Sequence, residues 1–158
     1  MSAPVDYERA LNYAVRYIGY TPCTQKRLRD KMKEKEFSPE SIVAVVQLLT
    51  EKRYLDDVTF AQNYITSKTR YKNYGRRRIV VGLMQKGVSK EDILVAYNAL
   101  LEQNDGENTD EVEAARRAMS KRVAKKDGDD RQKLMAYLMR RGFSYNIVKK
   151  VMDSNDEG

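Results

Sequence analysis

The sequence has no histidine and no tryptophan, and it has one cysteine, Cys23, among 158 residues. The lack of histidine removes the commonest general base and the commonest metal ligand. A single thiol cannot form an internal disulfide, and it leaves a zinc ion with too few ligands. We therefore expect a protein with no metal and no cofactor.

Long apolar segments are also absent. No run of about 18 apolar residues exists, which excludes a membrane span, and the N-terminal segment lacks the apolar core of a signal peptide. The lone cysteine is typical of a reducing compartment. We expect a cytoplasmic monomer that does not contact membranes.

Catalytic motifs are missing as well. The sequence contains no P-loop, no dinucleotide fingerprint and no nucleophile elbow. Asp56 and Asp57 are the one close carboxylate pair of interest before a predicted helix. Adjacent residues at a helix start do not face each other as a catalytic pair must, so this pair suits helix capping. We predict that the protein is not an enzyme.

What the chain does have is apolar residues spaced by three and four, the period of an α-helix. This pattern occurs three times in an internal repeat with a shift of about fifty residues, a period typical of helical arrays. Three positions of the repeat illustrate the match: Leu28, Ile79 and Leu134; Phe37, Val88 and Phe143; Ser38, Ser89 and Ser144. Gly87 and Gly142 also match, with Glu36 in the first copy.

The repeat predicts an all-α protein made of three tandem three-helix units. The units span residues 1–54, 55–104 and 105–158, and each buries too little surface to be stable alone. Stacking of neighbours should therefore produce an elongated, curved array. In unit one we expect Gly19 to end the first helix, while Thr24 and Ser38 begin the second and third, with Pro39 at the favoured first position.

The two connections between units differ in composition. Arg53, Tyr54 and Leu55 contain neither glycine nor proline, which predicts a tight junction between units one and two. The segment from Glu102 to Glu111 is polar and contains Gly106, which predicts a flexible hinge open to proteolysis before unit three.

Unit two carries the densest positive charge. We predict a helix from Asp57 to about Tyr71 and another from Arg76 that ends at Gly87. Arginines in the first turn of the second helix oppose the helix dipole, at a cost of roughly 0.3–1 kcal/mol each. An external anion held by free N–H groups and guanidinium groups would explain them, although a solvated charged face is the simpler alternative. The predicted partner-binding residues are Arg70, Lys72, Tyr74, Arg76, Arg77 and Arg78.

The net charge of +7 suits an acidic or polyanionic partner. Residues 1–54 carry 10 bases and 7 acids, residues 55–104 carry 8 and 5, and residues 105–158 carry 12 and 11. The excess of positive charge thus belongs to the first two units. Two classes of function remain: a regulator that binds an acidic groove of a protein filament, and a basic helical module that binds nucleic acid.

The middle of the chain also resembles a known family. The motif Tyr54-Leu-Asp-Asp57, followed by Tyr74-Gly75, Arg78-Ile79 and Lys86-Gly87-Val88, is similar to the second repeat of RecX proteins. The resemblance implies a non-enzymatic regulator that binds the RecA–DNA filament, with DNA as a further contact, and that most often inhibits recombinase, ATPase and coprotease activities in DNA repair. One departure is Arg53, which replaces a glycine often found there.

Overall fold

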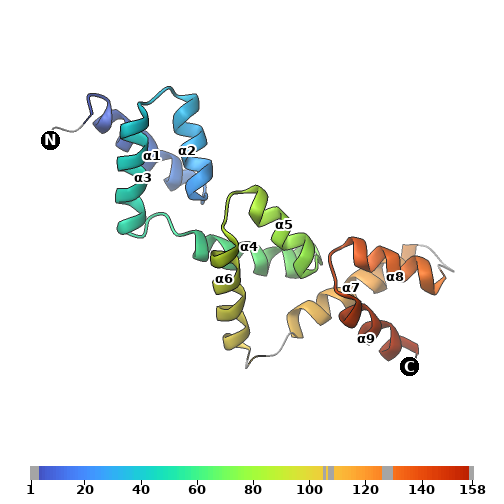
Figure 1. The fold of residues 1–158 in the computed structure, drawn as a ribbon. Coiled ribbons are helices and arrows are strands. Elements are labelled where there is room, and N and C mark those ends of the chain that lie inside the picture. The colour runs from blue at the N-terminus through green and yellow to red at the C-terminus, as the bar shows by residue number, and fades with distance from the viewer. Residues whose placement is uncertain (1–3, 105, 107–108, 126–129, 157–158) are drawn as a thin grey trace.

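The protein is an elongated row of three-helix units (Figure 1). The computed structural model describes residues 4–104, 106, 109–125 and 130–156, and every regular element in this part of the chain is a helix. The helices are α1 Tyr7–Tyr20, α2 Gln25–Glu34, α3 Pro39–Glu51, α4 Asp57–Tyr71, α5 Arg76–Gln85, α6 Lys90–Gln103, α7 Thr109–Lys125, α8 Arg131–Arg140 and α9 Tyr145–Asp156. The predicted all-α fold with three tandem three-helix repeats is confirmed.

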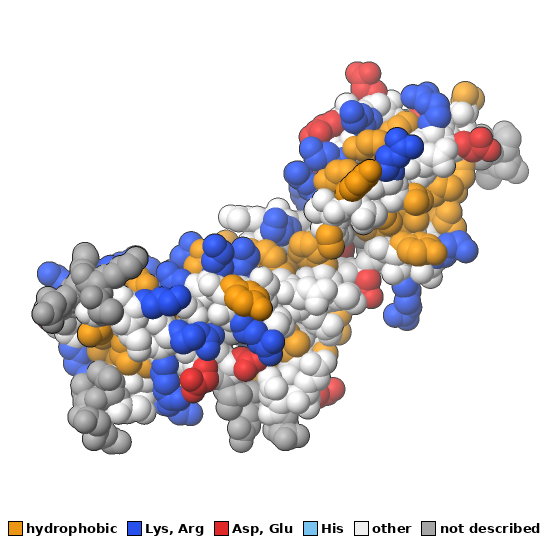
Figure 2. Space-filling model, turned by 180° about the vertical axis from the view of Figure 1, so that it is seen from behind, with side chains coloured by type: hydrophobic (Ala, Val, Ile, Leu, Met, Phe, Trp, Pro, Cys, Tyr) orange, Lys and Arg blue, Asp and Glu red, His pale blue; other side chains and the backbone are white. Residues whose placement is uncertain are grey.

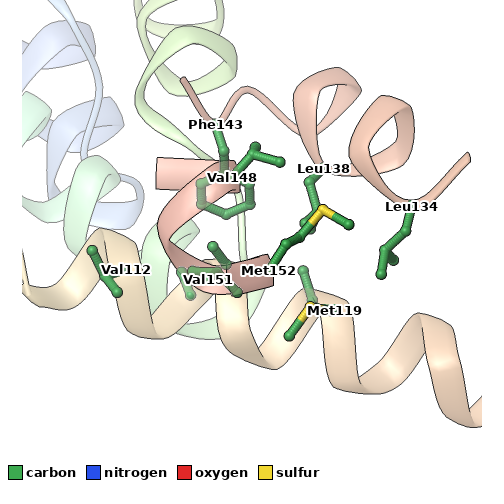
Figure 3. Close-up of a cluster of buried hydrophobic side chains, with 11 residues drawn as sticks. Val112, Met119, Leu134, Leu138, Phe143, Val148, Val151 and Met152 are labelled. Atoms are coloured by element: carbon green, nitrogen blue, oxygen red, sulfur yellow. The ribbon is translucent and has the colours of Figure 1, made fainter. Parts of the chain in front are cut away.

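Each unit has its own hydrophobic core. Leu28, Met32 and Val45 are central in the first, and Ile65, Ile79 and Leu83 are central in the second. In the third, side chains from α7, α8, α9 and the turn between α8 and α9 point toward one another (Figure 3); they include Leu138, Phe143 and Val148, all fully buried. Leu55 packs in the first core although it follows α3. Three small cores in a row leave part of the stability to contacts between neighbouring units.

Side-chain caps begin four of the helices in units one and two. The side chain of Thr24 accepts a hydrogen bond from the N–H of Arg27, and Ser38 does the same for Ser41, each at 3.2 Å. Asp56 and Ser89 cap α4 and α6 in the same way. These bonds satisfy N–H groups that have no partner within the helix, and they confirm the predicted starts.

Gly19 does not end α1, contrary to the expectation. The helix continues to Tyr20, and Thr21 follows with an extended backbone. Pro22 is the physical reason, because proline disfavours the helical conformation in the residue before it. Gly19 is tolerated in the last turn, where a Cβ would meet no atom within 4 Å.

The ends of the second helices confirm the alignment of the repeats. Glu36, Gly87 and Gly142 occupy the same place after α2, α5 and α8, and their φ angles are 63°, 91° and 100°. Glycine reaches this left-handed region without strain, whereas glutamate does not. Arg53, at the position where the related family often has glycine, also has a positive φ, of 62°.

The connection before unit three is shorter than predicted. Helix α6 continues to Gln103 and α7 begins at Thr109, so both ends of the expected segment from Glu102 to Glu111 are helical. Residues 105, 107 and 108 of that segment lie outside the described part of the chain. No helix in the described part is long and apolar enough to cross a membrane.

Candidate partner-binding surface

Consecutive units are joined through their second helices. At the first junction, the hydroxyl of Thr24 at the start of α2 donates to the carbonyl of Lys86 at the end of α5, at 2.7 Å. The N–H of Gln25, the first residue of α2, donates to the carboxylate of Asp57 in α4 at 3.0 Å. Burial raises the pKa of Asp57, and the hydrogen bond from Gln25 opposes that shift.

The second junction repeats this arrangement one unit further along. The N–H groups of Gly75 and Arg77 donate to the carbonyls of Arg141 and Gly142, at 2.8 and 3.1 Å. The N–H of Arg76, the first residue of α5, donates to the carboxylate of Glu111 in α7 at 2.9 Å. In both junctions the second helices therefore meet end to end, and a carboxylate of the next unit reaches the N-terminus, where the dipole favours negative charge.

This geometry corrects the predicted external anion site. The N–H groups of Gly75, Arg76 and Arg77 already have acceptors inside the protein. The carboxylate of Glu111 is the anion at the start of this helix. These contacts, with Asn73 in the turn before α5, also hold unit three on unit two, while the hinge between Glu102 and Glu111 stays a prediction. Spacing along one helix could not reveal that a carboxylate 35 residues away faces it.

The six predicted binding residues do not form one cluster of free charges. Arg70, Lys72, Arg77 and Arg78 are exposed, whereas the guanidinium of Arg76 lies over the ring of Tyr97, 4.2 Å from its centroid. Burial raises the pKa of Tyr97. Arg76 is therefore a packing residue as well as a charge.

Two arginines of unit three form hydrogen bonds with the end of α4 and the turn between α4 and α5. Arg117 donates to the side-chain oxygen of Asn73 at 2.8 Å and to the carbonyl of Thr69 at 3.1 Å. Arg141 donates to the carbonyls of Asn73 and Lys72. Asn73 is buried and has a φ of 55°, so these bonds fix a turn that asparagine adopts more easily than most residues.

Cations and aromatic rings alternate across this junction. The guanidinium of Arg78 is 3.9 Å from the centroid of the Tyr74 ring. The guanidinium of Arg141 lies near two rings, 5.1 Å from the centroid of Tyr74 and 5.6 Å from that of Tyr137. Arg122 is 4.8 Å from the Tyr137 ring. We call this series, Arg78, Tyr74, Arg141, Tyr137 and Arg122, the arginine–tyrosine row. Stacking on aromatic rings holds guanidinium groups in place and concentrates positive charge along the row.

A hollow of about 400 Å³ lies beside the row, and we call it the second groove. Its charged lining residues are Lys72, Lys121, Arg122 and Arg141, and no acid lines it among the residues that the structure describes. Figure 2 shows Lys and Arg side chains gathered over the half of the molecule formed by units two and three, with few Asp or Glu side chains on that face. This surface can attract an anionic partner over distances near the Debye length.

The predicted binding residues omit the contribution of unit three, although Lys121 and Arg122 lie on a predicted basic helix there. Its bases and acids nearly cancel, which hid the fact that the fold places Lys121, Arg122 and Arg141 together. The repeat itself held a signal: Arg141 precedes Gly142 as Lys86 precedes Gly87. Comparison of equivalent positions, rather than of net charge per unit, would have found it.

The fold and this surface define a class: a tandem array of three-helix units with a basic, aromatic face. Family models give the class a name. Residues 10–49, 56–96 and 109–152 match the models for the first, second and third three-helix domains of RecX. The chain belongs to the RecX family.

Individual relatives agree with this assignment. The chain is 33% identical over 151 residues to the regulatory protein RecX of Prosthecochloris aestuarii, and the match covers 94% of each chain. It is 34% identical to the regulatory protein RecX of Enterococcus faecalis, where it spans 55% of the relative's length. The crystal structure of RecX from Lactobacillus salivarius matches with a TM-score of 0.85 at 21% identity, covering 97% of this chain and 98% of that one. That likeness establishes the shared fold.

Proposed function

We propose that this protein is a non-enzymatic regulator that binds the RecA–DNA filament and inhibits its ATPase, recombinase and coprotease activities. Membership in a family named for regulation supports the role. The observation that carries the binding site is the second groove with its arginine–tyrosine row. Four bases and no acid of the described part of the chain line that groove, and such a surface suits the acidic groups of a filament.

The direct test is ATP hydrolysis by RecA on single-stranded DNA, with and without a substoichiometric amount of this protein. Suppression of hydrolysis below the stoichiometric ratio is the expected result, because one regulator on a filament affects many subunits. Unchanged hydrolysis at an excess of this protein would contradict the proposed function.

The contact residues need a separate test. Arg76 is a poor target, because a glutamate there would face Glu111. Lys72 and Lys121 line the second groove, and both side chains are exposed. We expect Lys72→Glu with Lys121→Glu to keep the fold, because the carbonyl of Lys72 can still accept from Arg141. The same variant should weaken filament binding on the order of tenfold, because two attractive charges become repulsive.

The matched control is Lys149→Glu with Lys150→Glu on α9, which makes the same change in net charge at exposed residues outside the grooves. If both double variants bind filaments equally weakly, net charge alone decides binding and the assigned surface is wrong. If the Lys72 and Lys121 variant binds like the wild type, the second groove is not the contact surface.

A second candidate function is binding to nucleic acid alone. Alternating cations and aromatic rings favour it, since bases stack on rings and phosphates pair with guanidinium groups. This candidate predicts binding of an oligonucleotide that falls steeply with salt, with no effect on RecA beyond competition for the strand.

A further inference from the structure

A second hollow lies at the junction of units one and two, and we call it the first groove. It consists of two adjoining cavities of about 530 and 690 Å³ that share the side chains of Cys23, Phe60, Tyr64 and Lys86. The Tyr64 ring is half-buried and stacks against Phe60 with centroids 6.2 Å apart. Burial raises the pKa of Tyr64, as expected for a ring enclosed by its neighbours.

The first groove is the repeat equivalent of the second. Lys86 precedes Gly87 as Arg141 precedes Gly142. Lys68 and Arg122 stand eleven residues after Asp57 and Glu111, the two carboxylates that reach the neighbouring helix. In each groove an aromatic ring therefore lies between two cations at equivalent positions.

The ring itself comes from a different helix in each groove. In the first, Tyr64 of α4 lies 5.3 Å from the ammonium of Lys68 and 6.0 Å from that of Lys86. In the second, Tyr137 of α8 lies between Arg122 and Arg141. The equivalent partner positions are small: Gly82 stands in α5 where α8 has Tyr137, and Ala118 stands in α7 where α4 has Tyr64. Both grooves thus have a ring between two cations. In the first groove the large residue is on α4 and the small one on α5, whereas in the second the small residue is on α7 and the large one on α8.

We propose that the first groove is a binding site for an acidic side chain of a protein partner, equivalent to the second groove one unit further along. The identity of the partner rests on the proposed function, whereas the site rests on the geometry. An array with two equivalent sites matches a partner that presents the same acidic group at regular intervals, as the subunits of a filament do. Binding two such sites at once strengthens attachment without new contacts.

The charge pattern of the first groove favours a protein over a phosphate chain. Its lining contains five bases, Lys26, Arg27, Arg53, Lys68 and Lys86. It also contains the acids Asp30 and Asp56, and Asp30 pairs with Lys26 at 2.8 Å. A continuous row of phosphates would meet these acids, while one carboxylate beside Lys68 and Lys86 would not. The aromatic floor provides a surface for the apolar neighbours of that carboxylate.

The first arm of the test uses the full chain and no RecA. Amide resonances are followed by NMR during titration with a peptide of alternating glutamate and leucine, with inorganic phosphate and an eight-residue oligothymidine as comparisons. We expect the peptide to shift the resonances of Tyr64, Lys68 and Lys86 at lower concentration than either phosphate compound. Absence of peptide-induced shifts in this groove overturns the proposal.

The second arm measures binding to RecA filaments on single-stranded DNA. Lys68→Glu with Lys86→Glu should weaken binding on the order of tenfold, and the control Lys149→Glu with Lys150→Glu should weaken it much less. We expect the groove variant to fold, because only the side chain of Lys86 changes and its carbonyl can still accept from Thr24. Thermal unfolding checks this expectation.

The outcomes separate the site from the function. Loss of oligothymidine binding with normal filament binding by the groove variant assigns the groove to nucleic acid and overturns the protein occupant. Normal filament binding without any change in oligothymidine binding overturns the site as a contact. If the wild type neither binds filaments nor alters hydrolysis while the peptide shifts persist, the proposed function fails and the acidic-side-chain site stands.

Discussion

The two junctions share one design but differ in how firmly they are held. The first is joined by two hydrogen bonds, from the hydroxyl of Thr24 to the carbonyl of Lys86 and from the N–H of Gln25 to the carboxylate of Asp57. The second has the equivalent carboxylate of Glu111, two backbone hydrogen bonds, and further bonds from Arg117 and Arg141. In a linear array each interface adds to stability nearly independently, so units two and three should behave as a more cooperative pair than units one and two.

The difference also explains why the repeats are not identical in sequence. A Cβ on Gly142 would lie 2.5 Å from the backbone nitrogen of Arg78, and one on Gly87 would lie 2.4 Å from Cβ of Lys26. Both glycines are thus required by the approach of the preceding unit as well as by their φ. Glu36 takes the equivalent position in unit one with a φ of 63°, so a side chain is accommodated there in spite of the left-handed backbone.

The largest expected effect comes from closing the space at the second junction. Gly142→Ala adds a left-handed penalty of about 1–2 kcal/mol to a clash with fixed backbone that costs about 1–3 kcal/mol. We expect a loss of about 3 kcal/mol or more in the free energy of unfolding, measured by urea denaturation and circular dichroism. Gly87→Ala should also cost more than backbone strain alone, because its nearest neighbour, Cβ of Lys26 at 2.4 Å, is held by the backbone of α2.

Gly106→Ala provides the control for backbone strain alone. Its φ is 77°, and a Cβ there would meet no atom within 4 Å. We expect it to cost about 1–2 kcal/mol. If Gly142→Ala costs no more than Gly106→Ala, the close approach of unit three to unit two is not required for stability.

The next effect concerns the two carboxylates at the helix starts. Asp57→Ala leaves the N–H of Gln25 without its acceptor at a junction with few other bonds, and should cost about 1–2 kcal/mol. Glu111→Ala should cost nearer to about 1 kcal/mol, since other bonds keep the second junction closed. Urea midpoints of the two variants test this order, and a greater loss for Glu111→Ala would reverse the comparison.

Much of the fold followed from the sequence, because helix periodicity and capping are local. The caps at Thr24, Ser38, Asp56 and Ser89 and the glycine ends needed only neighbouring residues. The binding surface was harder to predict from the sequence. The sequence predicts an external anion at Arg76 because the carboxylate that meets this helix, Glu111, is 35 residues away in the chain. The role of Arg141 likewise depends on a turn 68 residues before it. Contacts between residues so far apart in the sequence depend on how the units stack, and local sequence patterns do not predict that stacking.

A smaller effect tests whether the two grooves are equivalent. Tyr64→Ala removes the ring of the first groove, and Gly82→Tyr alone would drive a Cβ to 2.4 Å from the Tyr64 hydroxyl oxygen. The double variant reproduces the arrangement of the second groove, with alanine on the first helix and tyrosine on the second. We expect each single variant to lose stability and the double variant to recover about 1–3 kcal/mol of the summed loss. Strictly additive losses in a double-mutant cycle would show that the ring positions are not interchangeable.

The smallest effect lies within unit one, away from both junctions, and depends on pH. Asp6 accepts hydrogen bonds from the hydroxyl of Ser41 and from the N–H and hydroxyl of Ser38, which join the start of α1 to the start of α3. These bonds lower the pKa of Asp6 from 3.8 to about 2. Because the folded pKa is the lower one, the stabilisation is complete above pH 3.8 and disappears as the pH falls toward 2. Asp6→Asn should therefore lower the unfolding temperature at pH 6 and leave a smaller difference from the wild type near pH 2. A difference that is the same at both pH values would mean that the charge of Asp6 does not contribute, and that only the shape of its side chain matters.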